Sequence, residues 1–239
     1  MRKGLVELDW KQIDKYNDED ITYFLFAEGK SIDAICKIRN LDRTTVQNHV
    51  IEGKIKYRFL AKSKNSKEFF KTISKAGKGD KIEVLKSLNN DNKAKLIEFI
   101  RRNYKDMYSK DKESAIWILG EIGDINGLDI LMKASVHKFV NVRRMAVSAM
   151  GKLQNPKCEI ALIRALEDEN AQVVMYAIKA LQKINSIKAK EKILNIKDTT
   201  SKEYLKKAAL SYIETIENWD RVVNNLQEGE TLNIWVTLL

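Results

Sequence analysis

The chain has 239 residues, 44% of them hydrophobic and 32% charged, with ten glycines and one proline, and its formal net charge is +10. So few turn residues exclude a β-sandwich or barrel, and no apolar run is long enough for a membrane span, so we expect an all-α, cytoplasmic protein without membrane contact. Because Cys36 and Cys158 are isolated and there are only two histidines, we expect no disulfide framework, no metal site and no cofactor.

Three short helices are predicted near the N-terminus, over residues 20–28, 32–39 and 44–53. Asn40 lies between the last two, where a tight turn needs a residue that tolerates a left-handed backbone. Asp42 can then cap the third helix. Three short helices with a tight turn between the last two predict a helix-turn-helix.

The third predicted helix has an apolar and a polar face, with Val46 and Val50 expected to point inward. The polar face at its start carries groups that can read DNA bases, because arginine can donate two hydrogen bonds to guanine and Gln or Asn can pair with adenine. The candidate DNA-binding residues are Arg43, Thr44, Gln47 and Asn48, with Lys54, Lys56 and Arg58 as flanking phosphate contacts. His49 either packs in a half-buried position or contacts phosphate.

The run from Ala27 to Gly53, and especially its part from Asp42 to Val50, resembles the recognition segment of LuxR-type regulators and the helix-turn-helix at the C-terminal end of RecQ-like helicases. It departs from these families by carrying Cys36 in place of alanine and Asn40 in place of glycine. The resemblance implies DNA binding, and the abundance of Lys, Asn and Ile indicates a bacterial source. Because helix-turn-helix regulators commonly dimerise to span two half-sites, a homodimer is a further expectation.

Basic side chains are concentrated in residues 54–78, which hold nine lysines and arginines against one acid, Glu68, for a net charge of +8. Such a run either neutralises nucleic-acid phosphates or forms a solvated helix. We therefore expect a helix-turn-helix domain over residues 1–60 and a basic linker or helix over residues 61–80.

An internal repeat fills the C-terminal half of the chain. At an offset of 31 residues the sequence stacks apolar residues in two ladders: Ala115, Ala146, Ala177 and Ala208, and Ile100, Leu131, Leu162 and Ile193. Each unit has the length of two helices, and neither helix can bury its apolar stripe alone. The units are therefore expected to stack into an α-solenoid.

Within the repeats, residues 150–153, 160–166 and 168–170 resemble the HEAT-like repeat class named after phycobilisome lyases. The resemblance covers residues 81–218 and implies the solenoid fold without naming a chemistry. In such repeats an arginine at the position of Arg143 often makes a structural bond to a neighbouring unit.

Several other side chains are expected either in the core or on the surface. Trp117, Cys36 and Cys158 are expected in the core. Lys138 and Arg144 are the candidate ligand contacts on the repeat surface. Residues 219–239 form a tail whose apolar end, Leu232 to Leu239, should dock on the last repeat or on a neighbouring molecule.

Two functions compete at this stage. The first is a DNA-binding protein, a transcriptional regulator or nucleoid-associated adaptor, whose repeats recruit a protein partner or extend the nucleic-acid contact. The alternative is a non-catalytic scaffold for protein interactions, since solenoids present extended surfaces. No nucleotide-binding loop, nucleophile elbow or His-Glu metal pair is present in the sequence, so an enzyme is not expected.

Overall fold

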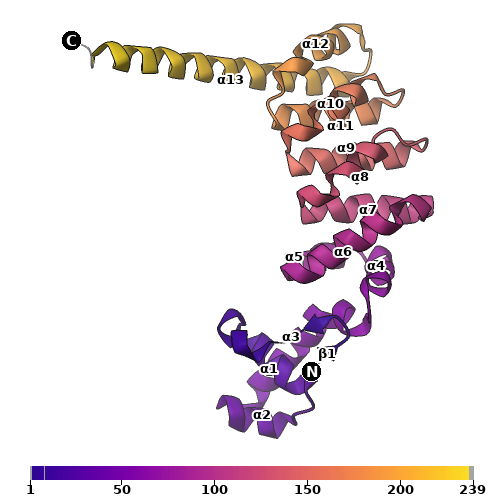
Figure 1. Ribbon diagram of the computed structural model, residues 1–239, viewed down its shortest axis with the longest axis vertical. Helices are drawn as coiled ribbons and strands as arrows, with labels where there is room; N and C mark the ends of the chain where they lie inside the picture. The colour runs from indigo at the N-terminus through magenta and orange to yellow at the C-terminus, as the bar shows by residue number, and fades with distance from the viewer. Residues whose placement is uncertain (1, 8, 237–239) are drawn as a thin grey trace. The chain divides into compact units, whose positions relative to one another are not determined.

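A computed structural model describes residues 2–7 and 9–236 of the chain (Figure 1). Apart from one hairpin of two-residue strands, the regular structure of these residues is helical, which confirms the all-α class. The chain divides into two compact units, Met1–Asn103 and Tyr104–Leu239. The segment boundaries expected at residues 60, 80 and 218 stay predictions. In the described part of the chain, no helix is long and apolar enough to cross a membrane.

The first unit begins with the antiparallel strands β1 (Arg2–Lys3) and β2 (Val6–Glu7), which the sequence patterns did not indicate. A 3-10 helix and six α-helices follow: η1 (Trp10–Lys15), α1 (Asp18–Ala27), α2 (Ile32–Arg39), α3 (Arg43–Lys62), α4 (Ser66–Lys75), α5 (Lys78–Ser87) and α6 (Asn90–Asn103). Because α3 contacts α1, α2, α4 and α5, it is the central element of this unit.

The turn between α2 and α3 is built on Asn40. Its backbone is left-handed, with φ 50° and ψ 45°, and the N–H of Leu41 donates to the Cys36 carbonyl at 3.2 Å. Asparagine tolerates this conformation better than most residues, so the turn predicted at this position is confirmed. Cys36 itself is half-buried, and its expected full burial is wrong.

Helix α3 is longer than the sequence indicated. The expected end at Gly53 is wrong, because the helix continues to Lys62. Gly53 is buried within the helix, and a Cβ at this position would overlap the Tyr23 side chain of α1. The glycine therefore marks a close crossing of two helices and not a helix end.

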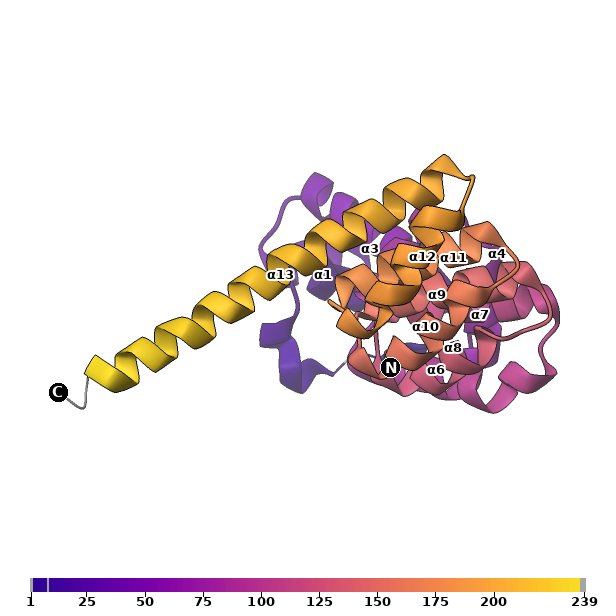
Figure 2. The same cartoon turned by 90° about the horizontal axis from the view of Figure 1, so that it is seen from above.

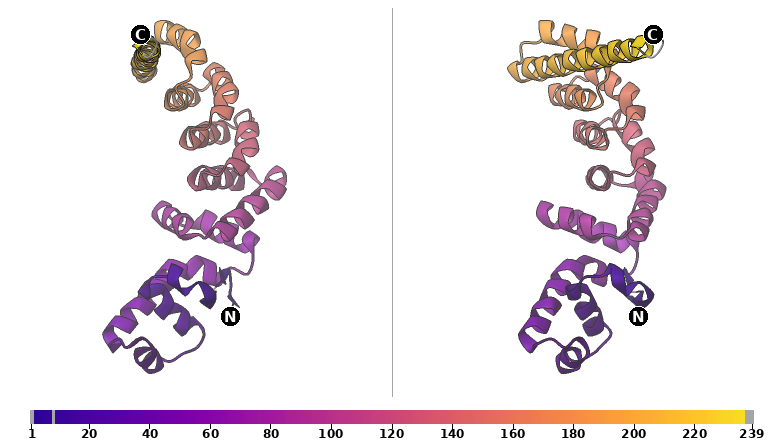
Figure 3. Two further views of the ribbon diagram at one scale, coloured as in Figure 1. Left: turned by 60° about the vertical axis from the view of Figure 1, so that its left-hand side comes forward. Right: turned by 90° about the vertical axis from the view of Figure 1, so that its left-hand side faces the viewer.

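The second unit consists of paired helices. Its α-helices are α7 (Ser109–Ile122), α8 (Leu128–Ala134), α9 (Val140–Leu153), α10 (Glu159–Arg164), α11 (Ala171–Lys183), α12 (Lys190–Thr199) and α13 (Glu203–Val236). The 3-10 helices η2 (Tyr104–Asp106), η3 (Ile125–Gly127), η4 (Pro156–Cys158), η5 (Ala165–Glu167) and η6 (Ile187–Ala189) adjoin them. In Figure 3 the longer helices α7, α9, α11 and the start of α13 stack in one layer, and α8, α10 and α12 form a second layer.

The 31-residue repeat determines which side chains form the core of this stack. Ala115, Ala146, Ala177 and Ala208 are all buried, as are Leu131, Leu162 and Ile193 of the second ladder. Small residues bring the helices of one layer close together. A Cβ on Gly120 of α7 would lie 2.7 Å from the Ala149 side chain of α9, and one on Gly151 would lie 2.9 Å from that of Ala180 in α11. The predicted stack of two-helix units is confirmed.

Two further expectations concern single residues. Cys158 is buried as predicted, and burial raises the pKa of its thiol to about 11. Trp117 is half-buried, so its expected place in the core is wrong: one face of its ring is left to the Lys152 ammonium, 5.9 Å from the ring centroid.

The C-terminal segment continues the last repeat helix. Helix α13 runs to Val236, and Figure 2 shows it extending beyond the other helices of its unit. The expected docking of the segment from Leu232 to Leu239 lies outside the residues whose side chains the structure describes.

Candidate nucleic-acid interface

The start of α3 is fixed by a side-chain cap. Asp42 Oδ1 accepts a hydrogen bond from the Thr45 N–H at 2.9 Å, and Asp42 Oδ2 accepts one from the Thr45 hydroxyl at 2.6 Å. These hydrogen bonds hold the pKa of Asp42 below its usual value. The cap predicted from the sequence is therefore present, and it gives the residues that follow a defined helical position.

The first turns of α3 have the two faces that the sequence predicted. Val46 and Val50 are buried. The candidate reading residues on the opposite side are all exposed: Arg43, Thr44, Gln47 and Asn48. Their side chains, a guanidinium, a hydroxyl and two amides, are those that can hydrogen-bond to base edges in a major groove.

Arg43 is not free within its unit. Its guanidinium forms an ion pair with Asp33 in the first turn of α2, and the two side chains are 60% and 76% exposed. An ion pair this exposed contributes little to the stability of the fold, so its main effect is to orient the Arg43 side chain. An incoming phosphate or base would have to displace Asp33.

The three flanking basic residues differ in their surroundings. Lys54 is exposed, with its ammonium 4.7 Å from the centroid of the Phe26 ring. Lys56 donates to both carboxylate oxygens of Asp20, at 2.7 and 2.8 Å. Arg58 pairs with Asp80 at 2.6 Å. Of the three predicted phosphate contacts, Lys54 is the one whose charge has no carboxylate partner in the described part of the chain.

Asp20 explains why Lys56 is held inside the unit. The Asp20 carboxylate is buried and also accepts a hydrogen bond from the Tyr57 hydroxyl at 2.9 Å. Burial, together with the neighbouring Asp20 charge, raises the pKa of Tyr57, so this hydroxyl remains a donor. A buried carboxylate needs such hydrogen-bond partners, so the role of Lys56 is to stabilise the fold.

The basic segment after α3 forms a packed helix. In α4, Phe69, Phe70 and Ile73 are buried, whereas Lys67, Lys71 and Lys75 are exposed. The three lysines are spaced by four residues and so share one face of the helix. None of the three has an ion-pair partner among the described residues, so their charges face solvent.

Other side chains near the reading face were not foreseen or were left open. Ile51 and Ile55 continue the exposed side of α3, and Ile38 is exposed on α2; in the sequence they follow the helical apolar spacing and look like core residues. His49 is half-buried, with Nδ1 3.2 Å from the Thr22 hydroxyl oxygen, which fits the packing alternative.

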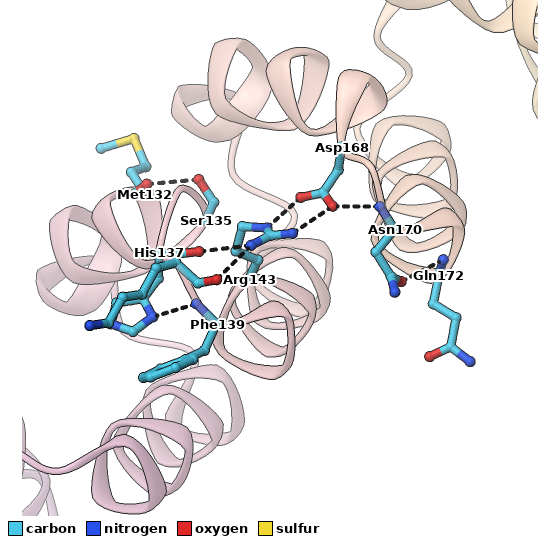
Figure 4. Close-up of polar contacts among 9 residues, drawn as sticks. Met132, Ser135, His137, Phe139, Arg143, Asp168, Asn170 and Gln172 are labelled. Atoms are coloured by element: carbon cyan, nitrogen blue, oxygen red, sulfur yellow. Dashed lines mark hydrogen bonds and ion pairs between the residues drawn. The ribbon is translucent and has the colours of Figure 1, made fainter.

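On the repeats, Arg143 makes a structural bond of the kind that the HEAT-like resemblance implied. Its Nε lies 2.6 Å from Asp168 Oδ2 and its Nη2 lies 2.9 Å from Asp168 Oδ1 (Figure 4). Arg144 donates to the Gln172 side chain at 2.9 Å. Lys138 is exposed beside the Phe139 ring, 5.1 Å from its centroid.

Comparison with known sequence families agrees with this architecture. Residues 18–97 match a family described as a helix-turn-helix domain, which takes in α4 and α5 as well as α1–α3. Residues 128–214 match HEAT repeats, and residues 111–137 match the PBS lyase HEAT-like repeat. The chain thus carries a helix-turn-helix domain followed by HEAT-type repeats. No curated protein is significantly similar to it in sequence.

Comparison with solved structures finds similar chains, among them an engineered protein and a designed repeat protein. An engineered protein is similar at a TM-score of 0.49 and 16% identity, over 85% of this chain and 98% of its own. A designed armadillo repeat protein in complex with the peptide (KR)4 is similar at a TM-score of 0.48 and 16% identity, over 84% of this chain and 100% of its own.

Within the described residues, no group of three His, Cys, Asp or Glu side chains could hold a metal ion.

Proposed function

We propose that this protein binds double-stranded DNA through the first two turns of α3, as a non-catalytic transcriptional regulator or nucleoid-associated adaptor. The observation that carries the proposal is the division of these turns into a buried side, Val46 and Val50, and an exposed side that carries hydrogen-bonding groups. A capped, rigid helix start of this kind can enter a major groove with its polar face toward the bases.

Charge supports the same proposal. Lys54 and the α4 lysines, Lys67, Lys71 and Lys75, present positive charge on the same unit as the reading face. Contacts to phosphates position a protein on the duplex without reading its sequence. We assign base contacts to Arg43, Thr44, Gln47 and Asn48, and phosphate contacts to Lys54 with the α4 lysines.

The test is a titration of a fluorescein-labelled, mixed-sequence duplex with the full chain, followed by fluorescence polarisation over a series of salt concentrations. Affinity should fall steeply and linearly on a logarithmic scale, because each neutralised phosphate releases condensed counterions. Absence of binding at low salt, or binding that salt does not weaken, contradicts the proposal. Selection from a randomised duplex pool then supplies the preferred site.

Two substitutions separate base contacts from phosphate contacts. Arg43→Lys keeps the charge but loses the two-donor fork, so it should weaken binding to the selected site about tenfold and leave the mixed-sequence duplex nearly unaffected. Lys54→Ala should weaken both duplexes and lower the salt slope by about one. Lys11→Ala removes another exposed charge, from η1, and is the control expected to weaken both duplexes less than Lys54→Ala does.

A second function, a scaffold for protein partners, is favoured by large apolar side chains exposed on the described repeats, such as Ile160 and Leu210. We propose that the repeats carry this role alongside DNA binding, with Lys138 and Arg144 as further surface contacts. In a pull-down with the full chain, the double substitution Arg43→Ala and Gln47→Ala should leave partner capture unchanged, whereas Ile160→Ser with Leu210→Ser should abolish it. The reverse pattern contradicts the assignment.

A further inference from the structure

One loop of the repeats departs from its counterpart in the next repeat. Residues 137–139, between α8 and α9, read His-Lys-Phe, and residues 168–170, which lie 31 positions further on, read Asp-Glu-Asn. The backbone is held alike in both loops: the Phe139 N–H donates to His137 Nδ1 at 3.1 Å, and the Asn170 N–H donates to Asp168 Oδ1 at 2.9 Å. The loop geometry is therefore retained while its chemistry changes from acidic and polar to basic and aromatic (Figure 4).

The same offset removes the ion pair between repeats. Arg143 and Asp168 correspond to Lys112 and His137 one repeat earlier. Two basic side chains thus occupy the positions of a cation and its carboxylate. The pKa of His137 is lowered by partial burial and by the positive charges of Lys112, Lys138 and Arg143, which places His137 in a locally positive field.

Aromatic rings occupy the helix caps at this edge. Tyr108 and Phe139 stand at equivalent positions before α7 and α9, and neither caps its helix with a side-chain hydrogen bond. At the same position before α11, Asn170 accepts a hydrogen bond from the Gln172 N–H at 3.0 Å. Replacing a capping residue by an aromatic ring costs stability, typically ~1 kcal/mol per helix.

The Tyr108 ring gains almost no burial in return, since it is 85% exposed. Phe139 is 45% exposed, and its ring packs against that of His137 with 5.3 Å between the centroids. Since α7 and α9 pack directly against each other, their equivalent ends lie roughly 10 Å apart. Lys138 adds positive charge beside Phe139, with its ammonium 5.1 Å from the ring centroid. The Lys112 ammonium donates to the Lys105 carbonyl at 3.1 Å and lies 5.7 Å from the Tyr104 ring centroid. Neither packing nor capping accounts for the Tyr108 ring, and capping does not account for the Phe139 ring.

We infer that Tyr108 and Phe139, with Lys138 beside Phe139 and Lys112 in the first turn of α7, form a binding site for single-stranded nucleic acid on the edge of the first repeats. Unstacked bases would lie on the exposed rings, and their phosphates would face the lysines. Duplex DNA does not fit this chemistry, because its base faces are already stacked. The inference does not rest on the proposed function of α3.

The open surroundings of Tyr108 favour a nucleic acid over an acidic peptide with aromatic side chains, whereas positive charge would attract either. Apart from Arg143, whose charge Asp168 compensates, residues 104–112 and 137–144 together hold five lysines and arginines against two aspartates, so the ligand should be anionic. Tyr108 stands out as a nearly free ring with no apolar pocket around it, which suits a flat base and offers little to a peptide side chain that needs enclosure.

The test uses the full chain and a fluorescein-labelled oligo(dT) at low salt, followed by polarisation. Tyr108→Asn and Phe139→Asn install the residue that caps α11, so they should raise the thermal midpoint while each weakens oligo(dT) binding about tenfold. Because these variants should be more stable than the natural chain, lost binding cannot be assigned to unfolding. Tyr204→Asn removes another exposed tyrosine of the same unit and should leave the affinity unchanged.

Three results would overturn the inference. The first is an unchanged oligo(dT) affinity in both asparagine variants. The second is loss of oligo(dT) binding in the variant Arg43→Ala with Gln47→Ala. The third is that the natural chain binds a Glu-Phe repeat peptide and that both asparagine variants lose this binding while they still bind oligo(dT). If the variant Arg43→Ala with Gln47→Ala loses duplex binding but keeps oligo(dT) binding, the result agrees with this inference and supports the separate assignment of duplex binding to α3. Photo-crosslinking of oligo(dT) to Tyr108 or Phe139 would locate the site directly.

Discussion

Arg143 and Asp168 form a two-point ion pair in which the side chains are only 17% and 7% exposed. The same guanidinium also donates from Nη1 to the His137 carbonyl at 2.9 Å. One side chain on α9 therefore holds the loop before its own helix and the loop before α11. The pair fixes two successive repeats relative to each other, so these two charged side chains have a structural role.

Replacing Arg143 with methionine should destabilise the repeats by about 3 kcal/mol, because it leaves the buried Asp168 carboxylate without its cation. The free energy of unfolding, measured by urea denaturation of the full chain, checks this. Arg144→Met is the matched control: Arg144 donates one hydrogen bond to Gln172, and its loss should cost less than about 1 kcal/mol.

The same variant gives a dependence on pH. Burial alone would raise the pKa of Asp168, but the Arg143 hydrogen bonds and the Asn170 N–H outweigh it and lower that pKa below 3.8. The unfolded chain therefore binds the proton first as pH falls. The stabilisation by the pair is complete above about pH 3.8 and is lost as pH falls through the lower folded value. The difference in the free energy of unfolding between the natural chain and Arg143→Met should become smaller as pH falls through that range. A difference that stays constant down to acid unfolding would contradict the lowered pKa of Asp168.

His137 should show a dependence on pH at a higher range. Its folded pKa lies below the ordinary 6.5, so the unfolded chain takes up a proton before the folded chain does. The free energy of unfolding should therefore fall as pH drops from 6.5 toward the lowered value. His137→Asp should remove this decrease and let Lys112 pair with a carboxylate, gaining up to about 1 kcal/mol. A natural chain equally stable across this range, by urea denaturation, would show that His137 is not in a positive field.

Periodicity determines what the sequence can reveal about this fold. The ladders through Ala146 and Leu131 predict the stack, because each position repeats a burial requirement every 31 residues. The sequence did not reveal that Gly53 lies inside a helix, since a glycine that permits a helix crossing and one that ends a helix look the same without the partner, Tyr23. It likewise could not assign Lys56 to a buried carboxylate, because Asp20 is remote in the sequence and its burial is a tertiary property.

Lys56 and Lys54 should respond differently to substitution. Lys56→Met removes two hydrogen bonds to a buried carboxylate and should destabilise the first unit by about 2 kcal/mol. Lys54→Met removes an exposed charge above Phe26 and should cost less than about 1 kcal/mol while weakening duplex binding. Urea denaturation and polarisation on both variants separate stability from affinity. An unfolding free energy that is equal for the two variants would place Lys56 on the surface with Lys54.

Gly53→Ala should destabilise the helix-turn-helix domain by about 2 kcal/mol, because the new methyl group overlaps the Tyr23 side chain and must push α1 away from α3. The matched control is Gly79→Ala in α5, where a Cβ meets nothing within 4 Å and the change should stabilise the helix slightly. Circular dichroism during thermal unfolding checks both. Equal midpoints for the two variants would contradict the close crossing.

The Arg43–Asp33 pair offers a way to strengthen DNA binding. Asp33→Asn frees the guanidinium and removes a negative charge beside the reading face, so duplex affinity should rise, by up to about fivefold since an exposed pair of this kind contributes at most ~1 kcal/mol. Removal of any acid could raise affinity through net charge alone. Asp14→Asn, an exposed aspartate of η1 in the same unit, is therefore the control and should raise affinity less. In the Arg43→Ala background the gain from Asp33→Asn should fall to that of the control. A gain that persists without Arg43 would show that Asp33 repels DNA directly and does not act by holding the arginine.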